Sequence, residues 1–186
     1  MSMIHGINIS IPYFSHELLD GLLPLVARSY ANEDYHWCPP GGIGQHFIHQ
    51  DDELAIVKPF IDDLLIKPKA DLGMLSITGP NTWLHKHSDI QSGFDWVKCK
   101  LTIPLTPRED FQPLPYYDEN DKVTLWPMSW HQPCLIDTIT VHGGFTTNQH
   151  LRAHLQFTFN REINEVISMI ENGQFLRSFE CTLMPG

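Results

Sequence analysis

The chain has 186 residues, 42% of them hydrophobic and 18% charged, and carries a net charge of -10. This length and composition are typical of one globular domain with a single apolar core. No segment approaches the roughly 20 consecutive apolar residues of a membrane helix, and no cluster of Lys and Arg marks a surface for nucleic acid. We therefore expect no membrane or nucleic-acid partner.

The N-terminal segment and the cysteines indicate the compartment. Residues 1–10 lack a basic stretch followed by a long apolar run, so no signal peptide is expected. The four cysteines are far apart and form no CxxC pair, which disfavours a zinc knuckle. They are Cys38, Cys99, Cys134 and Cys181. Without an export signal, we expect partly buried, reduced thiols in a cytoplasmic protein.

Two segments in the first third of the chain have leucines or other apolar residues at helical spacing. The segment 15–30 has Ser15 as its predicted N-cap and Pro24 as a point of kinking or division. The segment 51–66 begins with three acidic residues, which suit the first turn of a helix. Residues 1–70 are therefore expected to form a helical N-terminal part.

Beyond residue 67 the pattern changes to short apolar or alternating runs separated by turn-prone residues. Such runs predict the strands of an antiparallel sandwich or barrel. The six runs are 72–78, 82–87, 97–105, 122–126, 134–142 and 151–160. A closing helix is expected over 161–173. The predicted architecture is thus one domain, mainly β, with a core over 71–160 and a C-terminal helix and tail over 161–186.

Histidine is abundant, with 11 in the chain. Non-haem iron oxygenases bind their metal through two His and one carboxylate on one face, which leaves positions for co-substrate and oxygen. A His-x-Asp pair at a strand suits this site because residues i and i+2 point the same way. With 11 His and 13 Asp, about one pair is expected by chance, and two occur: His49 with Asp51, and His87 with Asp89.

Context distinguishes the two pairs. Asp51 begins a predicted helix, where it has an ordinary role as a cap. His87 and Asp89 instead follow a predicted strand and precede most of the β region. His142 ends a later predicted strand, just before a Gly pair. We therefore predict His87, Asp89 and His142 as the metal ligands.

Arg152 follows His142 by ten residues and opens an otherwise apolar strand. Two neighbouring antiparallel strands joined by a turn would bring both side chains to one cavity. A guanidinium there can hold a carboxylate through two parallel hydrogen bonds, which a Lys cannot do. The alternative for Arg152 is a buried salt bridge within the protein.

Four local features resemble one known family. They are a strand with Ser76, Pro80 and Thr82 before the first metal His, the next strand over 97–105, Asp137 five residues before His142, and the ten-residue step from His142 to Arg152. Over 72–159 the chain thereby resembles the aspartyl/asparaginyl β-hydroxylase-like branch of the Fe(II)/2-oxoglutarate dioxygenases. The resemblance implies a double-stranded β-helix, the jelly-roll barrel shared with cupins, and hydroxylation that uses Fe(II), 2-oxoglutarate and O2. An amino-acid, peptidyl or related small substrate is the family-level expectation.

The resemblance also assigns roles to individual residues. It implies His87 and His142 as ligands, whereas Asp89 departs from the best-known members, which place no carboxylate there. Related bacterial amino-acid hydroxylases keep the full His-x-Asp…His set, as this chain does. The implied co-substrate residues are Arg152 for the distal carboxylate, Ser76 as a second donor, and Lys100 and Thr102, which fall where the family has an Arg and a His. His154 shares the face of Arg152 by strand alternation.

His85 keeps a second hypothesis open. Gly79-x5-His85-x-His87 begins like the metal motif of a cupin, which shares the barrel. The chain lacks the Glu that this motif requires four or five residues later, and His142 lacks the preceding Pro-x-Gly. A metal-binding cupin enzyme that does not use 2-oxoglutarate is therefore the alternative. A non-catalytic β-sandwich binding protein is the third hypothesis.

Overall fold

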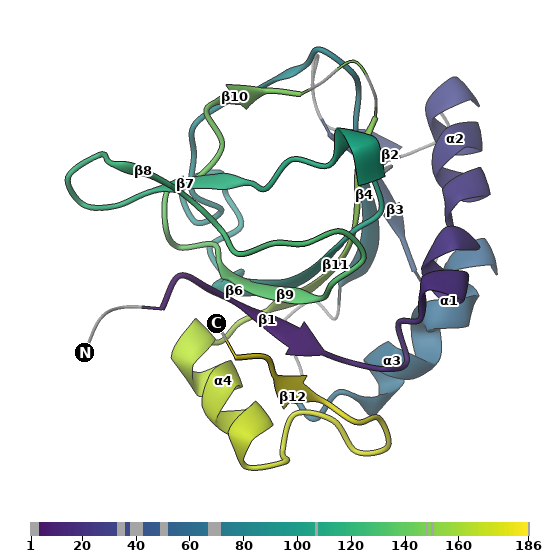
Figure 1. Cartoon of the computed structure of the whole chain (residues 1–186), viewed down its shortest axis with the longest axis vertical. Helices are drawn as coiled ribbons and strands as arrows, with labels where there is room; N and C mark the ends of the chain where they lie inside the picture. Colours follow the sequence, from purple (N-terminus) through teal and green to yellow (C-terminus); the bar gives the residue numbers. More distant parts are fainter. Residues whose placement is uncertain are drawn as a thin grey trace.

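The computed structural model describes residues 4–32, 36–37, 43–48, 52–66, 72–106, 108–147, 149 and 151–185. It is mainly β, with an eight-stranded antiparallel sheet, two two-stranded sheets, and helices outside the large sheet (Figure 1). The predicted fold class is therefore confirmed. Among the described residues, no helix combines the length and the apolar character needed to cross a membrane.

The large sheet has the strand order β12-β1-β9-β6-β11-β4-β3-β2. Its strands are β1 (Gly6–Ser10), β2 (His36–Trp37), β3 (Ile43–Phe47), β4 (Gly73–Thr78), β6 (Cys99–Pro104), β9 (Cys134–Asp137), β11 (Arg152–Phe159) and β12 (Thr182–Leu183). The strands β4, β6, β9 and β11 lie within predicted strand segments. The part over 1–70, expected to be helical, contains α1, α2, η1 and α3 and also contributes three strands that the sequence analysis did not predict, β1 toward one edge of the sheet and β2 and β3 at the other.

A smaller layer faces the large sheet. In it β5 (Trp83–Leu84) pairs with β10 (Phe145–Thr146), and β7 (Pro115–Tyr117) pairs with β8 (Val123–Leu125). His142 joins the two ladders, because its backbone bridges His87 on one side and Tyr116 on the other. The result is two facing antiparallel layers closed into a barrel, with the β7–β8 hairpin projecting at the left of Figure 1.

Side chains along β11 alternate between the two faces of the large sheet, as the strand period of two requires. The outer-face residues join the main apolar core under the helices and are Ala153, Leu155, Phe157 and Phe159. The inner-face residues are polar and are Arg152, His154, Gln156 and Thr158. On β9 the inner face carries Cys134 and Ile136, which pack against Trp126 from the β7–β8 side. The barrel interior is thus polar along β11 and apolar along β9.

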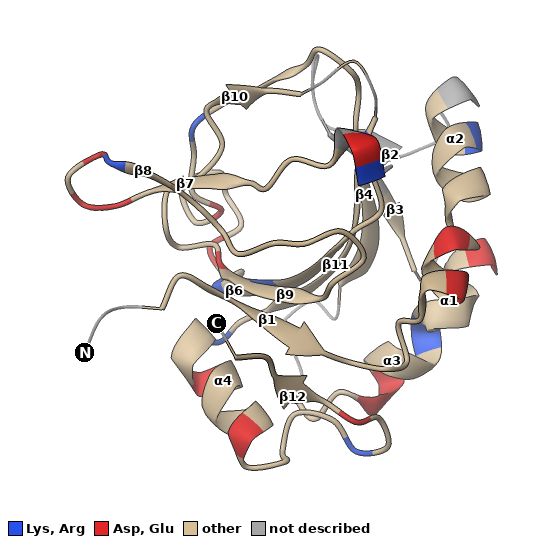
Figure 2. Ribbon diagram, in the orientation of Figure 1, with Lys and Arg blue, Asp and Glu red and all other residues tan. Residues whose placement is uncertain are grey.

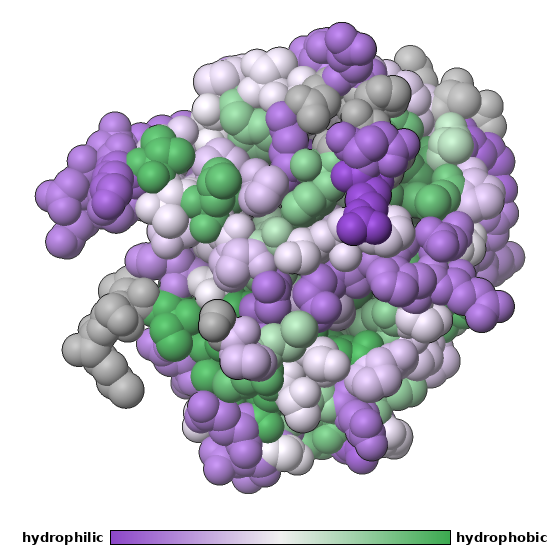
Figure 3. Space-filling model, viewed as in Figure 1, coloured by the Kyte–Doolittle hydropathy of each residue, from purple (hydrophilic) through white to green (hydrophobic). Residues whose placement is uncertain are grey.

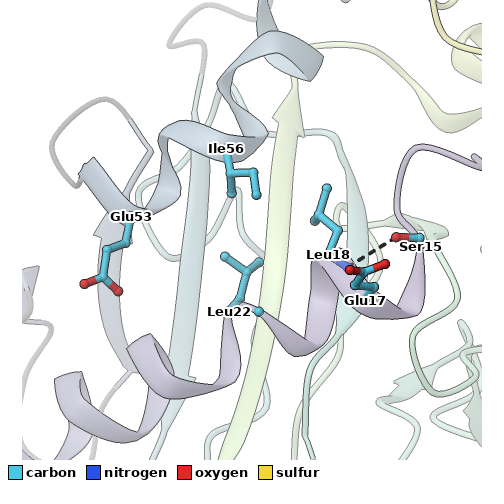
Figure 4. Close-up of a pocket in the computed structure, with 7 residues that line it drawn as sticks. Ser15, Glu17, Leu18, Leu22, Glu53 and Ile56 are labelled. Carbon is cyan, nitrogen blue, oxygen red and sulfur yellow. Dashed lines mark hydrogen bonds between the residues drawn. The ribbon is translucent and has the colours of Figure 1, made fainter.

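The helices cover the outer face of the large sheet (Figure 1). They are α1 (His16–Asp20), α2 (Leu23–Asn32), the 3-10 helix η1 (Asp52–Val57), α3 (Lys58–Asp63) and α4 (Ile163–Glu171). A short 3-10 turn, η2 (Arg108–Asp110), lies apart from them in the connection between β6 and β7. Ser15 caps α1 as predicted, since its hydroxyl accepts the Leu18 N–H at 3.2 Å (Figure 4). The predicted helix over 15–30 is divided between α1 and α2, with Pro24 in the first turn of α2.

A shallow groove lies between α1 and η1 (Figure 4). Leu18, Leu22 and Ile56 supply its apolar lining, and Glu17 and Glu53 flank it. The residues that line the groove do not include His87, Asp89 or His142, so the groove is a different place from the predicted metal group.

Charge and hydropathy vary over the surface. Acidic residues lie on the helices and at the tip of the β7–β8 hairpin, whereas Lys and Arg are scattered (Figure 2). Lys86 pairs with Asp121 at that tip and lies 3.8 Å above the Tyr117 ring. On β8, Val123 and Leu125 are more than half exposed, and Figure 3 shows apolar side chains on the projecting hairpin beside hydrophilic ones. The hairpin therefore exposes both charged and apolar side chains.

The described cysteines are free thiols, as predicted. Cys99 and Cys134 are buried, and Cys181 is partly buried. Burial raises the pKa of both Cys134 and Cys181 to about 12, so these thiols are poor nucleophiles at neutral pH. Cys38 lies outside the described residues.

Candidate metal centre

The structure brings together the three predicted ligands. His87, Asp89 and His142 offer ligand atoms that all lie within 4.8 Å of one another, and no other such group of three occurs within the part of the chain that is described. Asp89 Oδ1 lies 3.9 Å from His87 Nε2 and 3.8 Å from His142 Nε2. Two imidazoles and one carboxylate converging in this way form the donor set that iron(II) takes in non-haem oxygenases.

Backbone pairing sets the two histidines side by side. The His87 N–H donates to the His142 carbonyl at 2.8 Å, and the His142 N–H donates to the His87 carbonyl at 2.7 Å. The Asp89 N–H donates to the Thr138 carbonyl at 3.1 Å. Main-chain hydrogen bonds therefore hold the segment with His87 and Asp89 against the segment that leads to His142.

Carbonyl oxygens also orient both imidazoles. His87 Nδ1 lies 2.7 Å from the His85 carbonyl oxygen, and His142 Nδ1 lies 2.9 Å from that of Thr140. A carbonyl only accepts, so each Nδ1 carries the proton and each Nε2 keeps a lone pair for a metal. An outer carbonyl of this kind is the usual partner of a metal-binding histidine.

Asp137 shapes the turn that leads to His142. Its Oδ1 accepts the Ile139 N–H at 3.1 Å, and its Oδ2 accepts the Thr140 hydroxyl at 2.6 Å. Thr140 in turn offers the carbonyl that orients His142. His5 approaches the same network, with its Nδ1 2.9 Å from the Thr140 hydroxyl oxygen. The five-residue spacing from Asp137 to His142 thus corresponds to a folded turn.

The Gly pair after His142 is required by backbone geometry. Gly143 and Gly144 have φ of 87° and 71°, a region that side chains disfavour. A Cβ on Gly143 would lie 2.3 Å from the His85 carbonyl oxygen, and one on Gly144 would lie 2.3 Å from the Tyr117 hydroxyl. Only glycine allows the segment carrying His142 to approach the segment carrying His87 this closely.

Gly143→Ala should therefore lower the free energy of unfolding by about 1–3 kcal/mol or more, as backbone strain and the displaced His85 carbonyl add. Urea unfolding followed by circular dichroism measures this change. Gly93→Ala is the matched control, because Gly93 has φ of 92° but no atom within 4 Å of an added Cβ. Equal losses for the two variants would show that the close approach at Gly143 has no energetic consequence.

The protonation states of the group suit a metal. Burial raises the pKa of the Asp89 carboxyl, but the charge of Lys100 opposes it, and the resulting pKa lies below its ordinary value. Lys100 Nζ lies 2.8 Å from Asp89 Oδ2. Burial lowers the pKa of His142 to about 4. At neutral pH the group therefore offers an ionised carboxylate and a neutral imidazole, the forms that bind metal ions.

Arg152 is buried at the start of β11. Its Nη1 donates to the Gln112 carbonyl at 2.6 Å, its guanidinium lies 5.1 Å above the Phe145 ring, and its Nη2 has no hydrogen-bond partner. Burial lowers the pKa of Arg152 to about 10, which still leaves it charged at neutral pH. No carboxylate among the described residues pairs with it, so the buried salt bridge considered as its alternative is not found there.

The chain was compared with protein-family models, curated proteins and solved structures. No protein-family model matches the chain, and no curated protein matches it. Solved structures do match. A prolyl hydroxylase from Trichoplax adhaerens, solved with a peptide fragment of the oxygen degradation domain of hypoxia inducible factor, has a TM-score of 0.60 at 13% identity over 87% of each chain.

Two bacterial enzymes give the same result. A prolyl-4-hydroxylase from Pseudomonas putida has a TM-score of 0.57 at 14% identity, over 84% of this chain and 94% of that one. An oxidoreductase of the 2OG-Fe(II) oxygenase family from Burkholderia pseudomallei has a TM-score of 0.50 at 10% identity, over 78% and 92%. The chain has the fold of the 2OG-Fe(II) oxygenases. This is the predicted double-stranded β-helix.

Within this 2OG-Fe(II) oxygenase fold, the predicted co-substrate residues fall into two groups. Ser76 is buried on β4, directly across from His154 and two residue pairs along the ladder from Arg152. Thr102 is buried on β6 and accepts a hydrogen bond from the Gln156 amide at 3.4 Å. Lys100 is instead engaged by Asp89. Ser76 thus lies near Arg152 in the sheet, whereas Lys100 lies at the metal group.

Two further polar residues, Thr78 and His154, lie on the Arg152 side of the barrel. Thr78 is buried on β4 directly across from Arg152, a position that the sequence analysis missed. A period-two count from Ser76 would have found it. His154, which strand alternation places on the face of Arg152, is buried with Nε2 unpartnered. Burial and the charge of Arg152 hold the pKa of His154 well below its ordinary value, so it is neutral.

The other candidate ligand histidines are His85 and His49. The His85 side chain is exposed and lies outside the metal group, while its backbone carbonyl orients His87. His49 and Asp51, the second His-x-Asp pair, lie outside the described residues.

Proposed function

We propose that the protein is an Fe(II)- and 2-oxoglutarate-dependent oxygenase that hydroxylates an amino-acid, peptidyl or related small substrate. The observation that carries the proposal is one barrel interior holding both a two-histidine, one-carboxylate group and a buried arginine whose Nη2 is unpartnered. A metal group alone would fit many metalloenzymes. Arg152 adds a buried cation that can bind a carboxylate, and this combination favours an oxo-acid co-substrate.

His87, Asp89 and His142 are the residues that would hold Fe(II). Their two Nε2 atoms and Asp89 Oδ1 face one another, and the carbonyls behind the rings keep the lone pairs in place. Three ligands on one face leave room for co-substrate and oxygen. Bound iron would supply the activation of O2 for hydroxylation, coupled to oxidative decarboxylation of 2-oxoglutarate.

Arg152 would bind the distal carboxylate of 2-oxoglutarate. Its Gln112 and Phe145 contacts fix the guanidinium plane and leave Nη2 for an anion. Ser76 and Thr78 on the neighbouring strand and the neutral His154 supply further polar groups beside it. An isolated charge this deeply buried is costly, so its retention is best explained by a charged ligand.

The aspartyl/asparaginyl β-hydroxylase-like branch is the proposed subfamily. It is supported by the spacings from Asp137 to His142 and from His142 to Arg152, and the folded turn at Asp137 gives the first of these a physical basis. The peptide bound to the T. adhaerens enzyme supports a peptide as one class of substrate. The cytoplasmic location stays a prediction from the sequence.

The deciding experiment measures co-substrate turnover. Purified protein with Fe(II) and ascorbate is expected to convert 2-oxoglutarate to succinate, slowly alone and faster with the correct member of a panel of amino acids and peptides. Anaerobic calorimetry of the metal-loaded protein with 2-oxoglutarate tests binding independently of the substrate. Absence of binding at millimolar 2-oxoglutarate would reject the oxygenase and favour the cupin enzyme, while absence of metal binding would favour the non-catalytic protein.

A further inference from the structure

The two oxygens of the Asp89 carboxylate have different surroundings. Oδ1 lies between the two imidazoles, 3.9 Å from His87 Nε2 and 3.8 Å from His142 Nε2. Oδ2 lies 2.8 Å from Lys100 Nζ. The Asp89 side chain is 6% exposed, so water gives little help in fixing its orientation. The carboxylate therefore has one oxygen that faces the two histidines and one that forms an ion pair with Lys100, outside hydrogen-bond geometry.

Lys100 reaches this carboxylate from the inner face of the large sheet. It lies on β6, with Thr158 and Ile136 as its cross-strand neighbours, and its side chain is 16% exposed. Arg152 lies six residues from Thr158 along β11. At about 3.3 Å per residue, Lys100 and Arg152 thus approach opposite ends of the polar inner face. Lys100 belongs to the metal end.

We propose that Lys100 is a positioning residue of the metal centre, which fixes Asp89 as a ligand through one oxygen. This inference rests on the proposed function and replaces the co-substrate role that the family resemblance implies for Lys100. With Oδ2 held by an ammonium, only Oδ1 faces the histidines, so the carboxylate takes one position of a metal and leaves the others to co-substrate and oxygen. Without Lys100, the carboxylate is free to rotate and carries an uncompensated buried charge.

Lys100→Met tests the proposal, since it keeps the length of the side chain and removes the charge. Calorimetric titration with Mn(II), a redox-quiet substitute for Fe(II), is expected to show a Kd raised roughly 10- to 100-fold, the usual effect of losing an outer-shell partner. Lys100→Arg keeps the cation and should recover most of the affinity. Lys98→Met is the matched control, because Lys98 is a nearby lysine that pairs with the exposed Glu162. Its affinity should equal that of the wild type.

A double-mutant cycle separates positioning from general damage. If Lys100 acts through Asp89, then Lys100→Met should have little further effect on Mn(II) affinity in an Asp89→Ala background. Melting curves report whether each variant is folded. An equal loss of affinity in both backgrounds, or an unchanged affinity in the single variant, would overturn the proposal.

The co-substrate role gives a different result. If Lys100 binds 2-oxoglutarate directly, Lys100→Met should leave Mn(II) affinity intact and weaken 2-oxoglutarate binding at saturating Mn(II). That outcome rejects positioning while preserving the oxygenase. Failure of the wild type to bind Mn(II) is distinguishable from both, since it removes the metal centre itself.

Discussion

Replacing His142 by alanine is expected to weaken Mn(II) and Fe(II) binding by more than about 100-fold and to abolish succinate formation, while leaving the protein folded. Loss of an outer-shell partner already costs roughly 10- to 100-fold, and His142 offers a ligand atom itself. Its Nε2 lies 3.8 Å from Asp89 Oδ1, and its ring is buried between the layers. The backbone pairing with His87 does not depend on the side chain, so the segment around residue 142 should remain in place. Anaerobic calorimetry with a melting curve measures both effects.

His85→Ala is the control for this experiment. His85 is in the same ligand segment, but its side chain is exposed and its contribution to the centre is a backbone carbonyl, which alanine retains. Metal affinity should stay within about twofold of the wild type, the level of ordinary surface substitutions. Full metal occupancy in His142→Ala would reject the ligand assignment. Loss of metal in His85→Ala would instead support the cupin arrangement.

The core strands could be predicted from the sequence because they are apolar or alternating runs bounded by turns. The segments for β4, β6 and β11 are buried on both faces, and such runs stand out. By contrast, β1 has one buried residue of five, so its pattern is weak. The strands β5 and β10 have only two residues each, and hydrogen bonds between distant segments define them. Local pattern carries no such information.

The proximity of His87, Asp89 and His142 could be predicted because one part of the pattern is local, the His-x-Asp pair, and the other follows from the antiparallel arrangement of the chain. His87 and Asp89 follow a strand, and the Gly pair marks the strand of His142. The role of the Gly pair comes from tertiary geometry, namely the His85 carbonyl and Tyr117 hydroxyl that leave no space for a Cβ. The sequence therefore located the feature without giving its cause.

The partner of Lys100 could not be predicted. Asp89 and Lys100 are eleven residues apart, and their contact depends on how the chain after Asp89 turns back into β6. Thr78 was missed for a related reason, since only the register of β4 on β11 sets it across from Arg152. Pairwise contacts that depend on register or loop path are the part of a site that a single sequence leaves undetermined.

Arg152→Lys is expected to raise the Kd for 2-oxoglutarate roughly 10- to 100-fold without changing Mn(II) affinity. Lysine keeps the positive charge but loses the planar pair of donors, and a charge-assisted hydrogen bond is worth about 1.5–3 kcal/mol, with 1.4 kcal/mol per tenfold in Kd. The Gln112 carbonyl and Phe145 ring orient the guanidinium so that Nη2 is left over, and an ammonium has no equivalent second arm. The measurement is calorimetry of the anaerobic, Mn(II)-loaded protein with 2-oxoglutarate.

Arg161→Lys is the matched control, because Arg161 lies two residues beyond the end of β11 and is exposed. It should bind 2-oxoglutarate as the wild type does. If Arg152 is a structural residue only, Arg152→Lys should instead melt at a lower temperature while its affinity for 2-oxoglutarate stays unchanged. Parallel melting curves therefore separate the two roles. An unchanged Kd in a stably folded Arg152→Lys variant would reject the carboxylate receptor, and with it the observation that distinguishes an oxygenase from other metal-binding proteins of this fold.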